Sequence, residues 1–575
     1  MKVYRRVVLA CLLCGLVSGT SLMAQKAPQD KGTQPGTQQA AQEELFIDTV
    51  NVSVVNVDVY VTDKKGNRIN DLKQGDFEIY EDNRPMAVTN FYAVKDGKAV
   101  ATADAPETAP EGATPIAALD QVAVPEDQKL SLVVYIDNFN IRPFNRNRVM
   151  RELRVFLNNK LTKGDQVMLV SYDRSTHIRR PFTSDPDRIS AGLMELEKVT
   201  GHAVHYDSDR KDALRNIEDA QSANEAMMYA RSYAESLYND LSFTINAIKD
   251  LVNSLAGMPG RKAILYVSDG VPMMAGQDIF YAVQNKFGQE TGSLTEAFSY
   301  DASRRFTELT SQANANRVTF YPIDAAGLRV FGSISAENQG PGQGIMIDSI
   351  EISNLQSTLQ MMAEKTGGMA VINSNSAMPM LERIAQDFNT YYSLGYSPPH
   401  FGDGRYHKVE VKVKGKKGLV VRHREGYRDK TAETRMSDGT LAALKFPFEE
   451  NPLDIELEFG PATQRQDGYY LQEVNVRIPI GKLALVPRDK SQEARVRLFL
   501  AAMDGDGDTS EVQQQVVPIS VPEVEVATAV GKHYVYSVSL LMRPGQHKVG
   551  IGVRDDMSGQ SSFLSRVVVV GQRKG

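Results

Sequence analysis

Two aspartates in this chain each stand at the end of a stretch that reads as a buried β-strand. Asp137 closes "LSLVVYID" (residues 130–137), and Asp269 follows "AILYVS" (residues 263–268). Because the carboxyl ends of neighbouring parallel strands meet at one edge of a sheet, we expect the two carboxylates to face one crevice. Hard oxygen ligands of this kind suit Mg²⁺ and Ca²⁺. The pair therefore predicts a divalent-cation site, provided that further oxygen ligands lie nearby.

The loop after the first aspartate, "NFNI" (residues 138–141), weakens that prediction. Phe139 and Ile141 occupy positions where a cation site needs hydroxyl groups, and neither side chain offers an oxygen. One alternative is that loop amides, water or a basic neighbour such as Arg142 cap the carboxylates; another is that the crevice takes a different polar ligand. Two unpaired carboxylates that face each other repel, so we expect one of them to have a raised pKa unless something neutralises it.

The segment that must position these residues alternates strand and helix between residues 128 and 389. Predicted strands cover 130–137, 165–173, 262–270 and 317–325, and predicted helices cover 146–161, 211–255, 353–368 and 379–392. Strands with few charges, separated by helices, predict a mostly parallel sheet with helices on both faces. Two insertions, around 200–212 and 271–295, interrupt this pattern.

β-rich segments flank the α/β unit. Residues 45–95 contain alternating runs such as "VNVDVYV", and residues 390–428 hold three closely spaced strands. Because about fifty residues of strand make a poor core alone, we predict that the two segments pair as one β-sandwich into which the α/β unit is inserted. Residues 96–127, which are rich in Ala and Pro, read as a linker, and so do residues 429–449. Residues 450–575 predict a C-terminal all-β domain.

The N-terminus reads as a targeting segment. Residues 1–24 have the basic start, apolar centre and small-residue end of a secretory signal peptide, and residues 25–44 predict a disordered leader. Cys11 and Cys14, the only cysteines, lie in the signal peptide, so cleavage near Ala24 leaves a mature protein without thiol chemistry. "VLAC" also resembles a lipoprotein cleavage box, and lipidation at Cys11 is the alternative that would tether the protein.

Composition narrows the range of partners. The formal net charge is -6, so the chain lacks the excess of basic residues that is typical of nucleic-acid-binding proteins. After the signal peptide, no stretch has the unbroken apolar length of a transmembrane helix. We therefore expect an exported protein with no transmembrane span, located in the periplasm, in the cell envelope or outside the cell.

Several motifs together resemble one family. "LVVYID" and "ILYVSDG" on alternating strands are similar to the von Willebrand factor type A domain, and "GDFEIYEDNRPMAVTNFYAV" and "YYSLGYSPP…DGRYHKVEVKVK…VRHREGY" in the flanks sharpen the likeness. The combination, over most of residues 45–430, resembles the bacterial secreted proteins called VWFA-related domain proteins. The resemblance implies a Rossmann-like α/β fold and a role in binding protein, with no established catalytic activity.

The resemblance also implies the ligands of a metal-ion-dependent adhesion site: an Asp-x-Ser-x-Ser loop, a Thr and an Asp. Asp137 and Asp269 match the two aspartates, and Thr200 in "EKVTGH" is the candidate for the threonine. Both serines are replaced, while Asn138 and Asn140 carry amide oxygens one residue out of step. The site is therefore predicted to be degenerate: no cofactor is certain, and Mg²⁺ or another divalent cation would be bound weakly.

Other candidate sites are less specific. "HAVHYDSD" (residues 202–209) offers metal ligands but reads as a solvated loop, and "MDGDGDTSE" (residues 503–511) departs from the EF-hand pattern and reads as a turn between strands. Tyr391, Tyr392 and Tyr396 are a candidate interaction surface, but aromatic residues at a junction between helix and strand more often lie in the core, and the core is the favoured interpretation.

Catalytic motifs do not stand out. The sequence has no HExxH, no GxSxG and no cysteine nucleophile in the mature chain. We therefore predict a protein that is not an enzyme: an exported, adhesion-type protein that binds an unknown protein or a surface polymer. One alternative is a structural or assembly component of the cell envelope that binds through its β-rich flanks. Another is a metal-dependent hydrolase with an unrecognised site.

Overall fold

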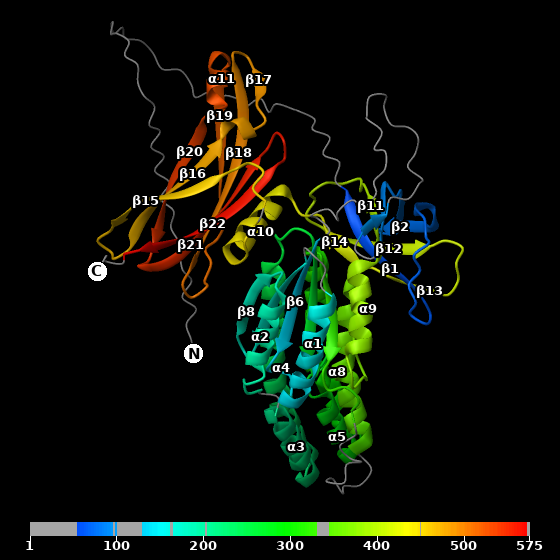
Figure 1. The fold of residues 1–575 in the computed structure, drawn as a ribbon. Helices are drawn as coiled ribbons and strands as arrows, with labels where there is room; N and C mark the ends of the chain where they lie inside the picture. The colour runs from blue at the N-terminus through cyan, green and yellow to red at the C-terminus, as the bar shows by residue number, and fades with distance from the viewer. Residues whose placement is uncertain are drawn as a thin grey trace, which may run out of the picture. The chain divides into compact units, whose positions relative to one another are not determined.

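The computed structural model describes residues 54–95, 98–100, 129–160, 165–201, 204–329, 344–448 and 450–571. This part of the chain divides into two compact units, one within Val54–Pro447 and one within Phe448–Gly575 (Figure 1). The predicted signal peptide and leader, Cys11 and most of the predicted 96–127 linker lie outside the described residues. Among the described helices, none combines the length and the apolar character needed to cross a membrane.

The first unit contains a five-stranded sheet with the order β10-β9-β6-β7-β8. Its strands are β6 (Leu130–Asp137), β7 (Gln166–Tyr172), β8 (Thr176–Thr183), β9 (Arg261–Ser268) and β10 (Val318–Asp324). β10, β9, β6 and β7 are parallel neighbours, and β8 runs antiparallel beside β7. Every residue of β9 is buried, as expected when helices cover both faces. The prediction of a mixed α/β protein with a mostly parallel sheet is confirmed.

Helices pack on both faces of this sheet (Figure 1). One layer consists of α1 (Pro143–Lys160), α2 (Pro186–Leu196) and α9 (Met378–Asn389). Met150, Leu193 and Leu381 of these helices share a core with Leu132 and Val134 of β6. The other layer consists of α4 (Ala223–Ser254), α7 (Ser303–Ala315) and α8 (Gly344–Thr366). The strands and helices that alternate in the sequence thus form three layers, with the sheet between two layers of helices.

A helical cluster with its own apolar core lies beside the first half of α4. It contains α3 (Val204–Asp219), α5 (Gln277–Phe287) and α6 (Ser293–Ala297), with the 3-10 turns η3 (Gln289–Thr291) and η4 (Phe298–Tyr300). Ala226, Ala230 and Ala234 recur every fourth residue, so they line one face of α4. Ile279 and Phe280 of α5 belong to the same core. Small side chains on α4 let the added helices approach closely.

The stretch predicted as one helix over 211–255 contains parts of two helices, α3 and α4. One helix over 211–255 is wrong, because Ser222 caps a new helix by accepting a hydrogen bond from the Glu225 amide (3.3 Å), so that α4 begins there. The described parts of the insertions around 200–212 and 271–295 are mainly helical. The apolar side chains of these helices do not pack on the sheet. They pack instead on the first half of α4, which supplies the apolar surface they need.

Both flanks of the α/β segment contribute to two further sheets, with orders β13-β1-β11-β4-β5 and β14-β12-β2-β3. Their elements are β1 (Val55–Asp63), η1 (Gln74–Asp76), β2 (Phe77–Glu81), β3 (Arg84–Met86), β4 (Asn90–Lys95), β5 (Lys98–Val100), β11 (Tyr391–Tyr396), β12 (Tyr406–Val413), β13 (Leu419–Arg422) and β14 (Gly426–Arg428). β1 pairs antiparallel with β11, with Val55 opposite Tyr396, and β2 pairs with β12, with Phe77 opposite Val413. Alternate residues of β12 are buried, which is the pattern of a strand with one face in a core.

The tyrosines of β11 lie in the core of these flanking strands. Tyr391, Tyr392 and Tyr396 are 3%, 4% and 0% exposed. The Tyr392 hydroxyl donates to the Ile69 carbonyl (2.8 Å) and accepts from the Leu72 amide (3.1 Å). A tyrosine can be buried in this way because its polar end finds partners. The interpretation of these residues as core is therefore confirmed, and the alternative of an interaction surface is wrong.

A buried ionic network joins the flanking strands to the α/β sheet. Asp387, at the end of α9, is fully buried; it accepts from Arg422 (2.8 Å) and pairs with Arg68. Arg261, at the start of β9, donates to Asp58 of β1 (3.0 Å). Removing one member of a buried pair leaves an uncompensated charge, so these contacts hold the flanks and the α/β sheet in one unit.

The predicted linker at 429–449 is a helix over most of its length, so that prediction is wrong. α10 (Ala432–Lys445) begins after Thr431, whose hydroxyl accepts from the Thr434 amide (3.1 Å). Its buried side chains include Met436, Thr440, Ala442, Ala443 and Leu444. The helix forms because this apolar face packs against α4.

The second unit consists mainly of strands. Its elements are β15 (Glu456–Gln464), β16 (Tyr470–Pro479), η6 (Ile480–Lys482), β17 (Val486–Arg488), β18 (Ser491–Asp504), β19 (Gln513–Pro522), η7 (Glu523–Glu525), α11 (Val526–Ala529), β20 (His533–Met542), β21 (Gly545–Asp555) and β22 (Ser561–Val570). Two sheets, β15-β16-β20 and β17-β18-β21-β22 with β19 beside β18, share one apolar core. Asp504 accepts from the amides of Asp506 and Asp508 (3.0 and 2.9 Å), so this acidic run forms a turn between strands.

Candidate functional site

Asp137 and Asp269 lie at the carboxyl edge of the parallel sheet. Asp137 is the last residue of β6, and Asp269 directly follows the neighbouring β9. Both are buried, with 0% and 7% of their surface exposed. The Asp269 amide donates to the Asn140 carbonyl (2.9 Å), which ties the loop after β9 to the loop after β6. The structure therefore brings the two carboxylates to adjoining loops, as expected from the strand ends.

Three donors of the chain itself hold the Asp137 carboxylate. The Tyr266 hydroxyl donates to Oδ2 (2.5 Å), and Asn140 donates its side-chain amide to Oδ2 (2.9 Å) and its backbone amide to Oδ1 (3.1 Å). Burial raises the pKa of Asp137 to about 6, and these hydrogen bonds limit the rise. Asn140 turns its amide nitrogen to the carboxylate, whereas a cation ligand would need to turn its oxygen.

Asp269 is surrounded in the same way. The Asn145 side chain donates to both carboxylate oxygens (3.0 Å each), and the Arg142 backbone amide donates to Oδ2 (2.9 Å). The Arg142 guanidinium lies 3.5 Å from the same oxygen. Burial raises the pKa of Asp269, and the contacts with Arg142 oppose that rise. Arg142 is thus the basic neighbour that the sequence offers as one alternative to a cation.

The other residues of the loop after β6 turn away from the carboxylates. Phe139 and Ile141 are buried, and Ile141 belongs to the apolar core of the sheet. Asn138 donates its side-chain amide to the Thr200 carbonyl (3.0 Å), and its side-chain oxygen accepts from Arg146. Ile141 thus points into the core of the sheet, and Phe139 packs against the rings of Tyr172 and Tyr206. Asn138 and Asn140 turn to different partners.

Three of the side chains around the carboxylates, those of Tyr266, Thr244 and Asn145, were not predicted from the sequence. Thr200 is exposed and meets the crevice loop through its backbone carbonyl. Thr244 of α4 is buried instead, and its hydroxyl accepts from the Asn140 side chain (3.3 Å). Thr244 lies in the middle of a long helix, where no local signal marks it. The position of Asn145 in the sequence gave a weak indication of its role, since it lies in the first turn of the helix that begins at the crevice.

Helix α3 contributes to the same crevice. Arg142 donates to both carboxylate oxygens of Asp207 (2.6 and 2.8 Å). Asp207 and Asp209 are helical residues, so the solvated-loop interpretation of this segment is wrong for them; helix formation follows from the packing of α3 on α4. Of the two histidines in "HAVHYDSD", His202 and the His205 side chain lie outside the described residues.

A cavity of about 90 Å³ adjoins these contacts. Asn140, Arg142, Asp207, Arg329 and Glu351 are among its lining residues. It has room for about three waters, since one water occupies about 30 Å³ in the liquid. Burial raises the pKa of Glu351 to about 7. The lining combines charged side chains of both signs with apolar ones such as Leu237 and Leu355, so the cavity can hold water or a small ligand that has both polar and apolar parts.

Hydrogen-bond donors limit the chemistry of this crevice. Each carboxylate oxygen of Asp137 and Asp269 accepts at least one O–H or N–H group. A Mg²⁺ ion needs about six oxygen ligands at about 2.1 Å, so it would have to displace these donors. Phe139 and Ile141 supply no oxygen in their place. The residues present do not fit a Mg²⁺ site, and the network they form fastens the two loops.

No family model matches this sequence, and no curated protein matches it. Several solved structures match part of the chain. An aerotolerance-related membrane protein from Bacteroides fragilis is 14% identical, with a TM-score of 0.23, and the match covers 45% of this chain and 98% of that one. The manganese-loaded TRAP protein of Plasmodium vivax is 11% identical, with a TM-score of 0.22 and coverage of 52% and 95%.

A third structure is proximal thread matrix protein 1 from the mussel byssus, with zinc in its MIDAS motif. It is 10% identical, with a TM-score of 0.24, and the match covers 47% of this chain and 48% of that one. TM-scores in this range carry no argument, so the fold described above rests on strand order and register. Proteins with a von Willebrand A-type domain are among the structural neighbours of this chain.

Proposed function

We propose that this protein is an exported, non-catalytic interaction protein of the adhesion type. In this proposal a Rossmann-like von Willebrand A-type domain, inserted in a β-sandwich and followed by a C-terminal all-β domain, binds another protein or a surface polymer. Its metal-ion-dependent adhesion site is degenerate, so binding does not run through a cation in the crevice. The N-terminal segment supports export to the periplasm, the cell envelope or the medium.

One contrast at the carboxyl end of the sheet carries the proposal. The carboxylates there are hydrogen-bonded to donors of the chain. Large apolar side chains in the segments that follow β6 and β10 are instead exposed to solvent. Phe144, which follows the loop after β6, is 78% exposed; Leu328, which follows β10, is 59% exposed; and Met346, at the start of α8, is 56% exposed. In this proposal the three side chains belong to one contact surface, since contiguous exposed apolar patches are typical of protein-binding surfaces. Binding at this end would therefore be apolar and independent of metal.

The test uses the secreted form of the protein and fragments of the producing cell's envelope. Sedimentation with these fragments measures binding, and Phe144→Asp and Leu328→Asp are expected to weaken it at least about tenfold, since apolar anchors of an interface each contribute on the order of 1–2 kcal/mol. Val524→Asp is the matched control, because Val524 is 91% exposed in the other unit. Mg²⁺ should leave binding unchanged. Binding that needs Mg²⁺ and Asp269 would contradict the proposal.

A second candidate is a structural role in the envelope through the β-rich parts. Val567 and Val569 are 51% and 50% exposed at alternate positions of β22, and Val535 of β20 is 48% exposed. Exposed β-branched residues on one strand face are suited to contact another sheet. In the same sedimentation assay, loss of binding in Val567→Asp with normal binding in Phe144→Asp would favour this role.

A further inference from the structure

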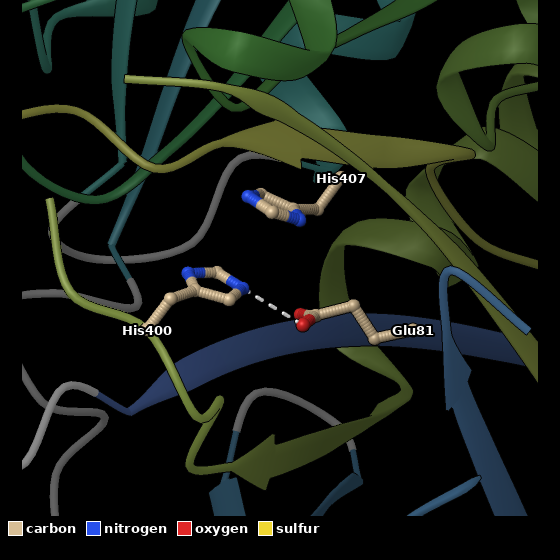
Figure 2. A group of neighbouring side chains, drawn as sticks. All are labelled: Glu81, His400 and His407. Atoms are coloured by element: carbon tan, nitrogen blue, oxygen red, sulfur yellow. Dashed lines mark hydrogen bonds and ion pairs between the residues drawn. The ribbon is translucent and has the colours of Figure 1, made fainter. Parts of the chain in front are cut away.

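A second group of chemically active side chains lies in the flanking strands, away from the crevice. Figure 2 shows Glu81, His400 and His407, with the two imidazole rings facing each other and His400 joined to Glu81. Glu81 ends β2, His400 lies in the loop between β11 and β12, and His407 lies in β12. Asp403 of the same loop and Asp429, just after β14, complete the group, which we call the histidine rim.

Both ring nitrogens of His400 face carboxylates. Nε2 lies 2.9 Å from Glu81 Oε1, and Nδ1 lies 3.0 Å from Asp429 Oδ2. A neutral imidazole carries one N–H and one lone pair, so one of these contacts would place a lone pair against a carboxylate oxygen. A metal ion or a second proton on that nitrogen removes the repulsion, and so does a proton on the facing carboxylate.

Glu81 decides which nitrogen keeps the hydrogen. Its carboxylate is buried, and its Oε2 accepts from the hydroxyls of Tyr396 (2.6 Å) and Tyr427 (2.8 Å). These donors hold Glu81 as a fixed acceptor, so the His400 Nε2–H points to it and Nδ1 is left facing Asp429. Metal-binding histidines commonly donate their other N–H to a carboxylate in this way.

The two histidines cannot share one ion. Their rings are 3.9 Å apart between centroids and within 15° of parallel. A metal ion lies in the plane of each imidazole that binds it, and two stacked planes have no common point between them. The nitrogens of His407 face Asp82 (2.9 Å) and Asp403 (3.2 Å) instead. His407 therefore orients Asp403 from the side.

The loop that carries Asp403 is shaped for this position. Gly402 and Gly404 both have left-handed backbone, with φ of 62° and 74°, which other residues rarely adopt. The Gly404 amide donates to the Asp429 carbonyl (2.7 Å), and the Asp403 amide donates to Asp429 Oδ2 (3.3 Å). The two glycines thus wrap the loop around Asp429 and place Asp403 beside His400.

We propose that His400 Nδ1, Asp403 and Asp429 bind a divalent transition-metal ion of the Zn²⁺ class. The ligand atoms of these residues lie within 4.8 Å of one another, and ligands on one tetrahedral Zn²⁺ lie about 3.3 Å apart, so small side-chain movements complete the set. One imidazole and two carboxylates suit Zn²⁺ or Mn²⁺ better than Mg²⁺. Asp403 is partly exposed, which leaves a fourth position open to solvent. Glu81 is the positioning residue for the His400 ring.

The experiment titrates Zn²⁺ into the chelator-treated full chain by calorimetry, with Co²⁺ absorption as a second readout. One Zn²⁺ per chain is expected, and Asp403→Asn and His400→Gln should each weaken it at least about tenfold. His177→Gln is the matched control, because His177 pairs with Asp173 at 2.9 Å outside the rim. Absence of Zn²⁺ binding, or binding unchanged in both rim variants, would overturn the proposal.

Three further variants separate this site from the crevice and test the role of Glu81. Asp269→Asn should leave Zn²⁺ binding intact, and loss of binding there with retention in Asp403→Asn would overturn the assignment. Glu81→Gln keeps an oxygen towards His400 and should retain the Co²⁺ spectrum with weaker affinity, whereas Glu81→Leu should lose the spectrum. Equal Co²⁺ spectra in all three proteins would remove Glu81 from the site.

Discussion

The crevice at the edge of the α/β sheet and the histidine rim both gather carboxylates, but their hydrogen-bonding balance is opposite. In the crevice, Asp137 and Asp269 receive hydrogens from hydroxyl, amide and guanidinium groups. In the histidine rim, His400 lies between the carboxylates of Glu81 and Asp429, so acceptors outnumber hydrogens. A cation would have to displace donors in the crevice, whereas it would relieve a repulsion in the rim.

This difference shows that the place of a carboxylate in the fold does not by itself decide whether it binds an ion. The crevice is where open α/β sheets place their ligands, yet there the side chains of Arg142 and Asn145 do what an ion would do. No such rule predicts a site in the flanking strands, where the proposed ligands His400 and Asp403 come from one loop and Asp429 follows the end of β14. The carboxylates in both places accept hydrogen bonds, so the feature that favours an ion in the rim is the His400 ring, whose two nitrogens both face carboxylates.

The largest expected effect comes from removing the acceptor at the centre of the rim. Glu81→Leu leaves the hydroxyls of Tyr396 and Tyr427 and the His400 ring without their buried acceptor, so the free energy of unfolding should fall by about 3–5 kcal/mol. Urea denaturation of both proteins measures the difference. Glu81→Gln is the control and should lose less, since one oxygen remains. Equal stability of Glu81→Leu and the parent protein would show that the rim is not a buried network.

The next effect concerns the crevice and depends on pH. Burial raises the pKa of Asp137 from 3.8 to about 6 in the folded state, so the native state holds this proton more tightly than the unfolded state. The resulting stabilisation is complete below about pH 4 and is lost as pH rises through about 6, and it amounts to about 3 kcal/mol.

Asp137→Asn removes this titration and isolates it from other groups. Relative to the parent, the variant should gain stability as pH rises from 4 to about 7, by up to the same about 3 kcal/mol. Denaturant unfolding at a series of pH values measures the gain. Parallel stability curves for the two proteins would mean that a partner, such as a bound cation, neutralises Asp137 in solution, and the contrast with the rim would then fail.

The smallest effect distinguishes two threonines at the crevice. Thr244→Val breaks the buried hydrogen bond with Asn140 and should lower the free energy of unfolding by about 1 kcal/mol. Thr200→Val leaves its backbone carbonyl in place and should change stability by less than about 0.5 kcal/mol. Thermal unfolding of both variants tests this order. A larger loss in Thr200→Val would place its hydroxyl, and not that of Thr244, in the crevice network.

Much of the α/β part was predictable because the signals are local. Apolar runs such as 130–137 and 262–270 locate strands, and their helical spacers imply a parallel sheet with Asp137 and Asp269 at one edge. The errors have a common cause: the burial of Tyr396, like the helix at 432–445, depends on partners far away in the sequence. The residues of each segment do not reveal these partners, so the tyrosines stayed a candidate surface and residues 429–449 a predicted linker.

The sequence by itself determined the α/β class and the residues at the strand ends, since hydrophobic period and strand polarity are properties of contiguous residues. The tertiary structure decided which polar groups meet. Glu81 and His400 are 319 positions apart, and Arg142 and Asp269 are 127 positions apart. Whether a buried carboxylate faces donors or acceptors depends on such distant partners, so the closed crevice and the open histidine rim became visible only in the folded chain.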